Sequence, residues 1–256
     1  MAVVVCIVPV SPMRREAAHR SEMVSQLLFG ECANILEDEG DFIKVRGAYD
    51  SYEGWCQRSQ LKAIDDSVPP ATTLFSSGFH DEVLLQGEPM SIPFGCPLYS
   101  AEQSAILFGE GLVDNKDLLP NAIQSSLGFT PERVRDISIR FLNTSYLWGG
   151  RSVFGIDCSG FSQQVFKLMG ISLLRDAYQQ AERGEAVPDL SSARIGDLVF
   201  FNNEAGRITH VGILLKPNEI IHASGRVRID RITGEGIYNE QDKKTHNLHS
   251  IRRMHA

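Results

Sequence analysis

The spacing of hydrophobic positions changes along this chain of 256 residues. Up to about residue 124, short apolar segments alternate with turn residues. Residues 3–8 are almost wholly apolar, and 33–46 contain two apolar segments around an acidic turn with a glycine. Residues 79–85 and 88–94 have the same texture. Short strands with frequent turn signals predict small β-barrels.

A helical pattern begins after residue 129. Thr130 is placed to cap a helix, and Pro131 suits its first turn. Within 132–142, Val134, Ile137 and Phe141 recur at helical spacing. A second helix is predicted from the apolar spacing over 161–168, and Gly170 stops it.

The rest of the chain predicts strands at 197–201, 210–215 and 219–224. Helices followed by an antiparallel sheet indicate an α+β domain. We therefore expect three domains: a small barrel over 1–66, a second over 67–124, and the α+β domain over 125–256. Residues 65–70, with Pro69 and Pro70, resemble a linker.

Composition narrows the class of protein. The chain is 43% apolar with a formal net charge of −7, and it has no Lys/Arg run, which argues against nucleic acid as a partner. Its five cysteines are scattered without a CxxC pair, which fits a reducing compartment. Residues 3–8 lack the basic flank of a signal peptide, and no apolar run reaches 18 residues. We expect a cytoplasmic monomer without a membrane partner.

Cys158 is the first candidate for chemistry. It opens the predicted helix after Asp157, a plausible cap. At this position, unpaired N–H groups and the helix dipole favour a thiolate, so a nucleophile is predicted. The alternative is a buried, inert cysteine.

Two histidines strengthen the case for a nucleophile. If residues 215–218 turn a hairpin, His210 lies opposite Ser224 and His222 opposite Gly212, so both rings share one face. One imidazole could then act as base and the other orient it. Two half-buried histidines without chemistry are the alternative. The other five histidines have no such context, and the three near the C-terminus, His246, His249 and His255, are expected in solvent. A zinc site at Cys158 lacks a fourth ligand, so no metal or cofactor is expected.

Four sequence blocks carry a family resemblance. They begin at Tyr146, Asp157, Ile195 and Thr209, and read YLWGG, DCSGF, IGDLVFF and THVGI. In this order they resemble the NlpC/P60 cysteine peptidases, papain-like enzymes that cleave bacterial murein peptides. The resemblance implies that Cys158 is the nucleophile, His210 the base and His222 the third, polar member. It also implies that the Tyr146 hydroxyl and the Cys158 N–H hold the oxyanion.

The first part of the chain resembles bacterial SH3 (SH3b) domains, through the Tyr52 to Trp55 segment and the segment around Glu22. Two SH3b barrels before a papain-like domain resemble the γ-D-glutamyl-L-diamino-acid endopeptidases of murein recycling, also called dipeptidyl-peptidase VI. In that subfamily the first SH3b domain helps bind a free α-amine. The resemblance implies that the substrate is bound by Glu22, Tyr52, Trp148, Asp157, Ser159, Arg175 and Asp176.

The expected reaction is hydrolysis of the γ-D-glutamyl bond in L-Ala-γ-D-Glu-diamino acid peptides. Ala177 stands where we expect a serine hydroxyl in this subfamily, which affects one contact to the substrate carboxylate. Glu31 competes with Glu22 for the amine. A secreted autolysin that cleaves intact wall, and a non-catalytic wall-peptide binding protein, are the alternatives.

Overall fold

The computed structural model describes residues 2–64 and 71–254. Its chain forms two compact units: Met1–Ser126 with Trp148–Val153, and Leu127–Leu147 with Phe154–Ala256. The linker predicted at 65–70 lies outside the described residues. Within the described part, no helix combines the length and apolar character needed to cross a bilayer.

The first unit begins with an antiparallel seven-stranded sheet in the order β3-β2-β6-β5-β4-β1-β7. The predicted hairpin within 33–46 is present, with Ile35 opposite Val45. Apolar side chains that include Val4, Ile43 and Cys56 fill its core. The strands are β1 (Val3–Cys6), β2 (Val10–Arg14), β3 (Met23–Leu28), β4 (Cys32–Glu39), β5 (Phe42–Gly47), β6 (Glu53–Gln57) and β7 (Leu61–Ile64).

Residues 71–126 add two small sheets and a helix that the sequence reading missed. Helix α1 (Ala101–Phe108) starts with a capping box between Ser100 and Gln103, a signal that was legible in the sequence. Its Leu107 and Phe108 share one hydrophobic core with Val5 and Phe29. The strands are β8 (Leu74–Phe75), β9 (His80–Leu85), β10 (Glu88–Pro93), β11 (Pro97–Leu98), β12 (Val113–Asp114) and β13 (Ile123–Gln124).

The second unit has the predicted α+β order. Helix α2 (Pro131–Ile139) is capped by Thr130, whose side chain accepts the Arg133 N–H. Helix α3 (Cys158–Lys167) begins at Cys158, and α4 (Ala177–Ala181) follows. The strands are β15 (Gly155–Ile156), β16 (Glu185–Val187), β17 (Leu198–Asn202), β18 (Ile208–Lys216), β19 (Glu219–Ser224), β20 (Arg226–Thr233), β21 (Gly236–Tyr238) and β22 (Lys244–Arg253). Short β14 (Arg151–Ser152) falls in the first unit.

The closed barrel lies in this second unit. Its sheet runs β16-β22-β17-β18-β19-β20-β21, and β21 also pairs with β22, which closes a ring. Among the described residues, the pairings of the N-terminal sheet leave it open. The closed barrel therefore lies at the C-terminal end of the chain, whereas the sequence pattern predicted barrels at the N-terminal end. Closure also needs β22 to pair with β17, which lies far from it in the sequence, and local patterning does not encode such a pairing.

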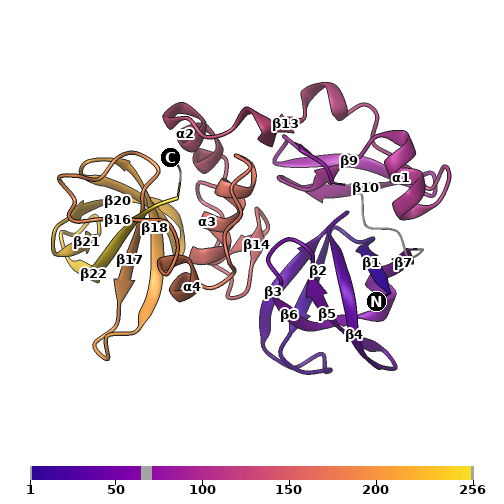
Figure 1. The fold of residues 1–256 in the computed structure, drawn as a ribbon, viewed down its shortest axis with the longest axis horizontal. Helices are drawn as coiled ribbons and strands as arrows, with labels where there is room; N and C mark the ends of the chain where they lie inside the picture. Colours follow the sequence, from indigo (N-terminus) through magenta and orange to yellow (C-terminus); the bar gives the residue numbers. More distant parts are fainter. Residues whose placement is uncertain (1, 65–70, 255–256) are drawn as a thin grey trace. The chain divides into compact units, whose positions relative to one another are not determined.

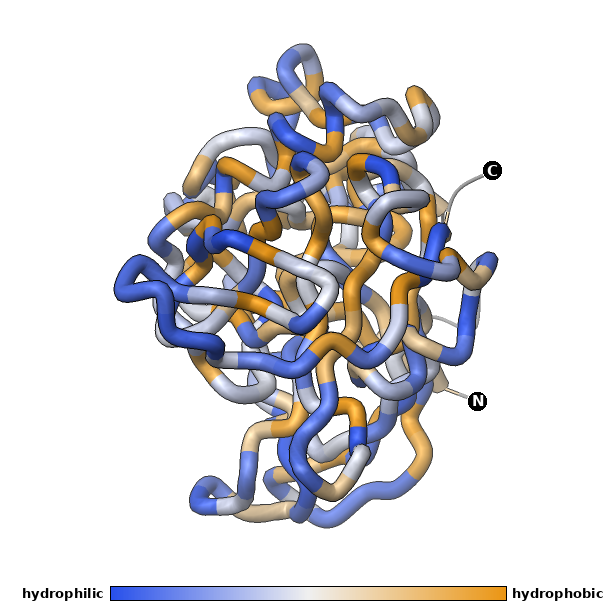
Figure 2. The backbone as a smooth tube through the Cα atoms, turned by 90° about the vertical axis from the view of Figure 1, so that its left-hand side faces the viewer, coloured by the Kyte–Doolittle hydropathy of each residue, from blue (hydrophilic) through white to orange (hydrophobic). Residues whose placement is uncertain are grey.

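Apolar side chains fill the ring, while helices α3 and α4 pack against its strands β18, β19 and β22 (Figure 1). Val199, Phe201, Leu214 and Ile220 belong to the interior cluster. Several protruding turns of the chain are hydrophilic, and many hydrophobic segments lie away from them (Figure 2). The ring is thus a rigid platform for the polar side chains that share its interior face.

Candidate active site

The two predicted histidines lie as the hairpin model required. Strands β18 and β19 pair with Ile213 opposite Ile221, which is the register that sets His222 opposite Gly212. His210 lies opposite Phe201, a residue of the ring interior. The rings meet, because His210 Nε2 is 2.7 Å from His222 Nδ1. Hence Nδ1 of His210 remains for proton transfer with a thiol.

The polar chain continues beyond His222 to a carboxylate. His222 Nε2 lies 3.0 Å from Asp230 Oδ2, and Arg228 donates two hydrogen bonds to Asp230 Oδ1. Burial would raise the pKa of Asp230, but the bonds from His222 and Arg228 lower it. The carboxylate is therefore ionised and directs the His222 proton toward itself. The sequence reading missed Asp230, although Gly225 marks the turn that brings β20 beside His222.

His246 corrects a second expectation. It was predicted to lie in solvent, yet its ring stacks on His210, with centroids 4.2 Å apart and planes at 25°. It is partly buried, and its pKa is lowered to about 4. Burial is the main cause, and the neighbouring His222 lowers the pKa further. Its place depends on closure of the ring through β21 and β22, where Ile237 lies opposite His246.

The three rings offer metal-ligating nitrogens within 4.8 Å of one another. Imidazole lone pairs lie in the ring plane, however, and two nearly parallel stacked rings do not direct them at one point. The 2.7 Å between His210 Nε2 and His222 Nδ1 is also a hydrogen-bond separation that accommodates a proton. These rings fit a proton relay better than a preformed metal centre.

Cys158 is the first residue of α3, with Asp157 as its cap. The Asp157 carboxylate accepts the Gly160 N–H at 2.7 Å, as expected of a helix cap. The backbone N–H groups of Val211 and Ser159 interact with the sulfur. Since Val211 follows His210 on β18, this contact brings the thiol to the strand of the base.

The thiol itself is neutral at rest, which differs from the thiolate expected at a helix start. Burial raises the pKa of Cys158 to about 12, and the charge of Asp157 adds to the rise. Val211, Arg175 and Ser159 lower it, but less. Burial, and then His222 and His246, also hold the pKa of His210 well below its usual value. Thiol and imidazole are therefore both uncharged before substrate binds.

The cap residue Asp157 forms a buried ion pair with Arg175. Arg175 donates to both oxygens of Asp157, at 3.0 and 2.6 Å, and to the Ser159 hydroxyl at 2.9 Å. Asp157 is 5% exposed and Arg175 1%. The charge of Asp157 is thus balanced inside the domain. Asp176 follows Arg175 at the start of α4, where its N–H donates to Gln179.

A polar cavity of about 350 Å³ lies beside the base. It is lined by Tyr146, Thr209, His210, Ala223, Ser224, Gly225 and His246. Burial raises the pKa of Tyr146, and the nearby Cys158 and Asp157 add to the rise, so the hydroxyl stays protonated. Tyr146 is therefore a hydrogen-bond donor close to the nucleophile, as an oxyanion group must be.

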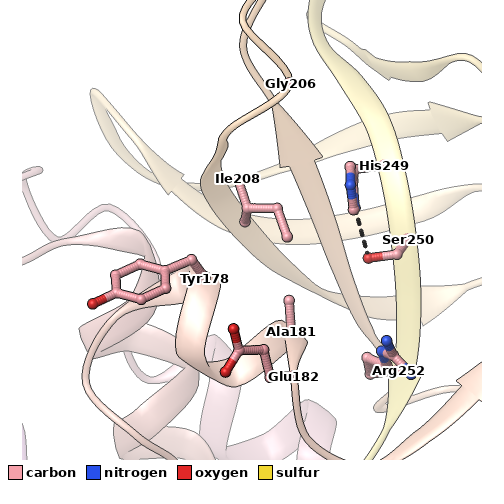
Figure 3. Close-up of a pocket in the computed structure, with 8 residues that line it drawn as sticks. All are labelled: Tyr178, Ala181, Glu182, Gly206, Ile208, His249, Ser250 and Arg252. Atoms are coloured by element: carbon pink, nitrogen blue, oxygen red, sulfur yellow. Dashed lines mark hydrogen bonds between the residues drawn. The ribbon is translucent and has the colours of Figure 1, made fainter.

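A second cavity of about 320 Å³ lies between α4, β18 and β22 (Figure 3). Tyr178 and Glu182 line it from the helix side, and His249 and Arg252 line it from β22. No residue predicted from the sequence lines it.

The remaining predicted residues belong to the first unit. Glu22 is partly exposed; its Oε1 accepts the Trp148 Nε1–H at 2.7 Å, and its Oε2 pairs with Arg15. Trp148 is 60% exposed, and Tyr52 is half-buried. A Cβ at Gly149, whose φ is +77°, would lie 2.6 Å from the Met23 carbonyl oxygen, so only glycine allows this approach.

Glu31 has a different environment. It is buried, and its two carboxylate oxygens pair with Arg151 at 2.8 and 3.1 Å. Its Oε2 also accepts the Leu28 N–H at 3.0 Å. Glu31 is thus held in a buried ion pair, whereas the partners of Glu22 lie at the surface, which favours Glu22 over Glu31 as the acceptor for an amine.

Known proteins share both parts of this chain. The profile of the NlpC/P60 family matches residues 143–246, and that of the bacterial dipeptidyl-peptidase SH3 domain matches 13–61. The chain is 33% identical over 220 residues to a gamma-D-glutamyl-L-lysine dipeptidyl-peptidase of Bacillus subtilis, covering 78% of this chain and 71% of that protein. It is 29% identical to dipeptidyl-peptidase 6 of Lysinibacillus sphaericus, covering 80% and 81%.

The fold is also found among solved structures. An NlpC/P60 protein from Bacillus cereus superposes with a TM-score of 0.77 at 19% identity, covering 98% of this chain and 99% of that one. At this identity the likeness concerns the fold alone.

Proposed function

This chain belongs to the NlpC/P60 family of cysteine peptidases, and we propose that it releases an N-terminal dipeptide from murein peptides by cutting a γ-D-glutamyl-diamino acid bond. The two relatives described above, which cover 78% and 80% of this chain, are named for a γ-D-glutamyl-L-lysine dipeptidyl-peptidase and a dipeptidyl-peptidase activity. The observation that carries the chemistry is the buried hydrogen-bonded chain His210–His222–Asp230. It begins on β18 at His210, and the next residue of that strand, Val211, contacts the Cys158 sulfur through its backbone N–H.

Because the Cys158 thiol and the His210 imidazole are both neutral at rest, the thiol must lose its proton during the attack. As the Cys158 sulfur attacks the γ-carbonyl carbon, its proton passes to Nδ1 of His210. The carbonyl oxygen becomes an oxyanion, for which the Tyr146 hydroxyl and the Cys158 N–H are donors. The first N–H groups of a helix lack intrahelical partners. The Gly160 N–H is bonded to the Asp157 carboxylate, and the Cys158 N–H is the one that we assign to the oxyanion.

His210 then returns the proton to the nitrogen of the leaving diamino acid, and the C–N bond breaks. The thioester that remains on Cys158 is attacked by water, which His210 deprotonates, and the dipeptide leaves. During both steps the imidazolium is stabilised by His222, whose far nitrogen is bonded to the Asp230 carboxylate.

Recognition of a free amine is part of this proposal. The Glu22 carboxylate is partly exposed, and its ion pair with Arg15 is exposed as well. Such surface pairs contribute about 0–1 kcal/mol, so a substrate ammonium can compete for the carboxylate. Because Glu22 is exposed and keeps Arg15 when the amine is acylated, the ammonium contributes only a surface ion pair of about 0–1 kcal/mol, which corresponds to a discrimination of up to roughly fivefold against an acylated amine.

The experiment compares three substrates: L-Ala-γ-D-Glu-L-Lys, its N-acetyl form and intact murein sacculi. We expect L-Ala-D-Glu and L-Lys from the free peptide, slower cleavage of the acetylated one and no solubilisation of sacculi. Cys158→Ala provides the inactive reference. Equal kcat/KM for the first two peptides removes the amine requirement, and release of soluble fragments from sacculi favours a wall autolysin. Action on small free peptides accords with the cytoplasmic location that we also propose.

Glu22→Gln tests the recognising group. It should lower kcat/KM for the free peptide and narrow the gap to the N-acetyl form. Glu37→Gln is the matched control, because Glu37 is also an exposed glutamate paired with one cation, Lys44. If the ratio of kcat/KM between the free and the N-acetyl peptide is unchanged in Glu22→Gln, another residue recognises the amine.

A further inference from the structure

Torsional preference does not fix the ring of His210. The χ2 torsion of histidine joins an sp³ to an sp² carbon and has a broad, roughly two-fold energy profile. A ring flip exchanges Nδ1 with a carbon, which would remove the base from the thiol. One in-plane bond, from Nε2 to His222, resists this flip. Contacts on the ring face must supply the remaining restraint.

His246 provides such a contact. Its ring covers a face of His210 at 4.2 Å, while Phe201 packs near both rings, with centroids 5.8 Å from each. The ring of His222 stands nearly perpendicular to both, at 81° and 89°. His210 is thus held by one hydrogen bond and by aromatic contacts from separate strands.

The position of His246 is itself constrained. Its Nδ1 lies 2.9 Å from the Thr245 hydroxyl. A Cβ at Gly236, whose φ is +146°, would lie 1.8 Å from the His246 carbonyl oxygen. Only glycine at this position lets β21 pack so tightly against the backbone that carries His246. The closed ring therefore presents the stacking face at a defined place.

Resting on the peptidase function proposed above, we propose that His246 is a positioning residue that holds His210 in its reactive ring orientation by stacking. The stack involves an uncharged ring at neutral pH, so another flat aromatic side chain should replace it. Alanine should not. An engaged base contributes about 10²- to 10⁴-fold to rate, and partial loss of its orientation should lower kcat about tenfold.

The test uses His246→Ala and His246→Phe in the full chain. We expect kcat to fall about tenfold in the alanine variant with KM changed less than about twofold, and to recover in the phenylalanine variant. His249→Ala is the control, since His249 lies three residues away on β22, is exposed and lines the other cavity. It should leave kcat unchanged.

A second readout needs no substrate. Long-range ¹H–¹⁵N spectra of ¹⁵N-histidine-labelled protein report the tautomer and mobility of His210, assigned by its absence in His210→Gln. We expect one tautomer in the parent and in His246→Phe, and averaged nitrogen shifts in His246→Ala. Unchanged His210 signals with parental kcat in His246→Ala would overturn the proposal. So would a well-folded His246→Phe as impaired as the alanine variant. Because the spectra do not involve peptide, an error in the substrate assignment cannot produce either result.

Discussion

The Nε2 of His222 and the Oδ2 of Asp230 are 3.0 Å apart, in a pair that is almost fully buried. The pair fixes which nitrogen of His222 carries the proton, and leaves its Nδ1 to accept from Nε2 of His210. Asp230 therefore determines the tautomer of the base through an intervening ring. The Asp230 carboxylate, which is separated from the thiol by His210 and His222, is therefore part of the catalytic machinery.

Asp230→Asn tests this relay. The amide keeps the shape but can donate to His222 Nε2, which reverses the tautomers, so kcat should fall roughly ten- to hundredfold with little change in KM. Asp242→Asn is the control, because Asp242 is an exposed aspartate paired with Arg231. Its kinetics should match the parent. A fall below threefold in Asp230→Asn would mean that His222 is oriented without it.

The lowered pKa of His210 predicts the acid side of the pH profile. His210 must be neutral to accept the thiol proton, and its pKa lies well below 6.5. The value of kcat/KM should therefore persist as pH falls through 6.5 and drop only under more acidic conditions. The Cys158 thiol, with a pKa of about 12, should add no limb near neutrality, and its alkylation rate should keep rising with pH. A limb at or above pH 6.5 would indicate a resting thiolate–imidazolium pair.

The same lowered pKa values predict that acid weakens the fold. An unfolded histidine binds a proton near pH 6.5, whereas folded His246 does so at about 4. The unfolded state therefore binds more protons in this window, and the free energy of unfolding should decrease as pH falls through it. For this partly exposed ring we expect about 1–3 kcal/mol. Urea unfolding of His246→Phe, which lacks the titrating group, should give a flatter curve, and an identical slope would contradict the assignment.

Part of this site was predictable because it depends on local rules. A cap, a helix start and a hairpin turn specify where Cys158 lies on α3 and how His210 and His222 share a face. Asp230 could have been predicted by extending the same reasoning to the next hairpin, which turns at Gly225 and pairs β19 with β20. His246 was beyond such reasoning, because its place beside His210 depends on the pairing of β22 with β17, two strands that are far apart in the sequence. The neutral thiol was equally hidden, since burial depends on the packed domain and outweighs the helix dipole that the sequence reveals.

Glu22 and Glu31 should separate cleanly in experiment. Glu31→Gln leaves Arg151, 2% exposed, without its countercharge, and should lower the free energy of unfolding by about 3–5 kcal/mol. Glu22→Gln removes only surface contacts and should cost less than about 1 kcal/mol. Urea unfolding of both variants measures the difference. Equal stability of the two would mean that the Arg151 charge is balanced by other groups.

Asp157 and Arg175 couple the stability of the domain to the reactivity of Cys158. Asparagine at 157 still caps α3, but it leaves the Arg175 guanidinium buried without a countercharge, which should cost about 3–5 kcal/mol. Because Asp157 raises the pKa of the thiol and Arg175 lowers it, the variant should also lower the Cys158 pKa. Alkylation at a fixed neutral pH should then be faster than in the parent.

The double variant Asp157→Asn/Arg175→Met separates the two effects. Removing both charges should recover most of the lost stability and return the alkylation rate toward the parental value. Asp242→Asn, at an exposed ion pair, should change neither quantity. If alkylation of Cys158 stays faster in the double variant, the Arg175 charge is not the cause of the faster reaction. The shape of the cap, rather than its charge, would then control the reactivity of the thiol.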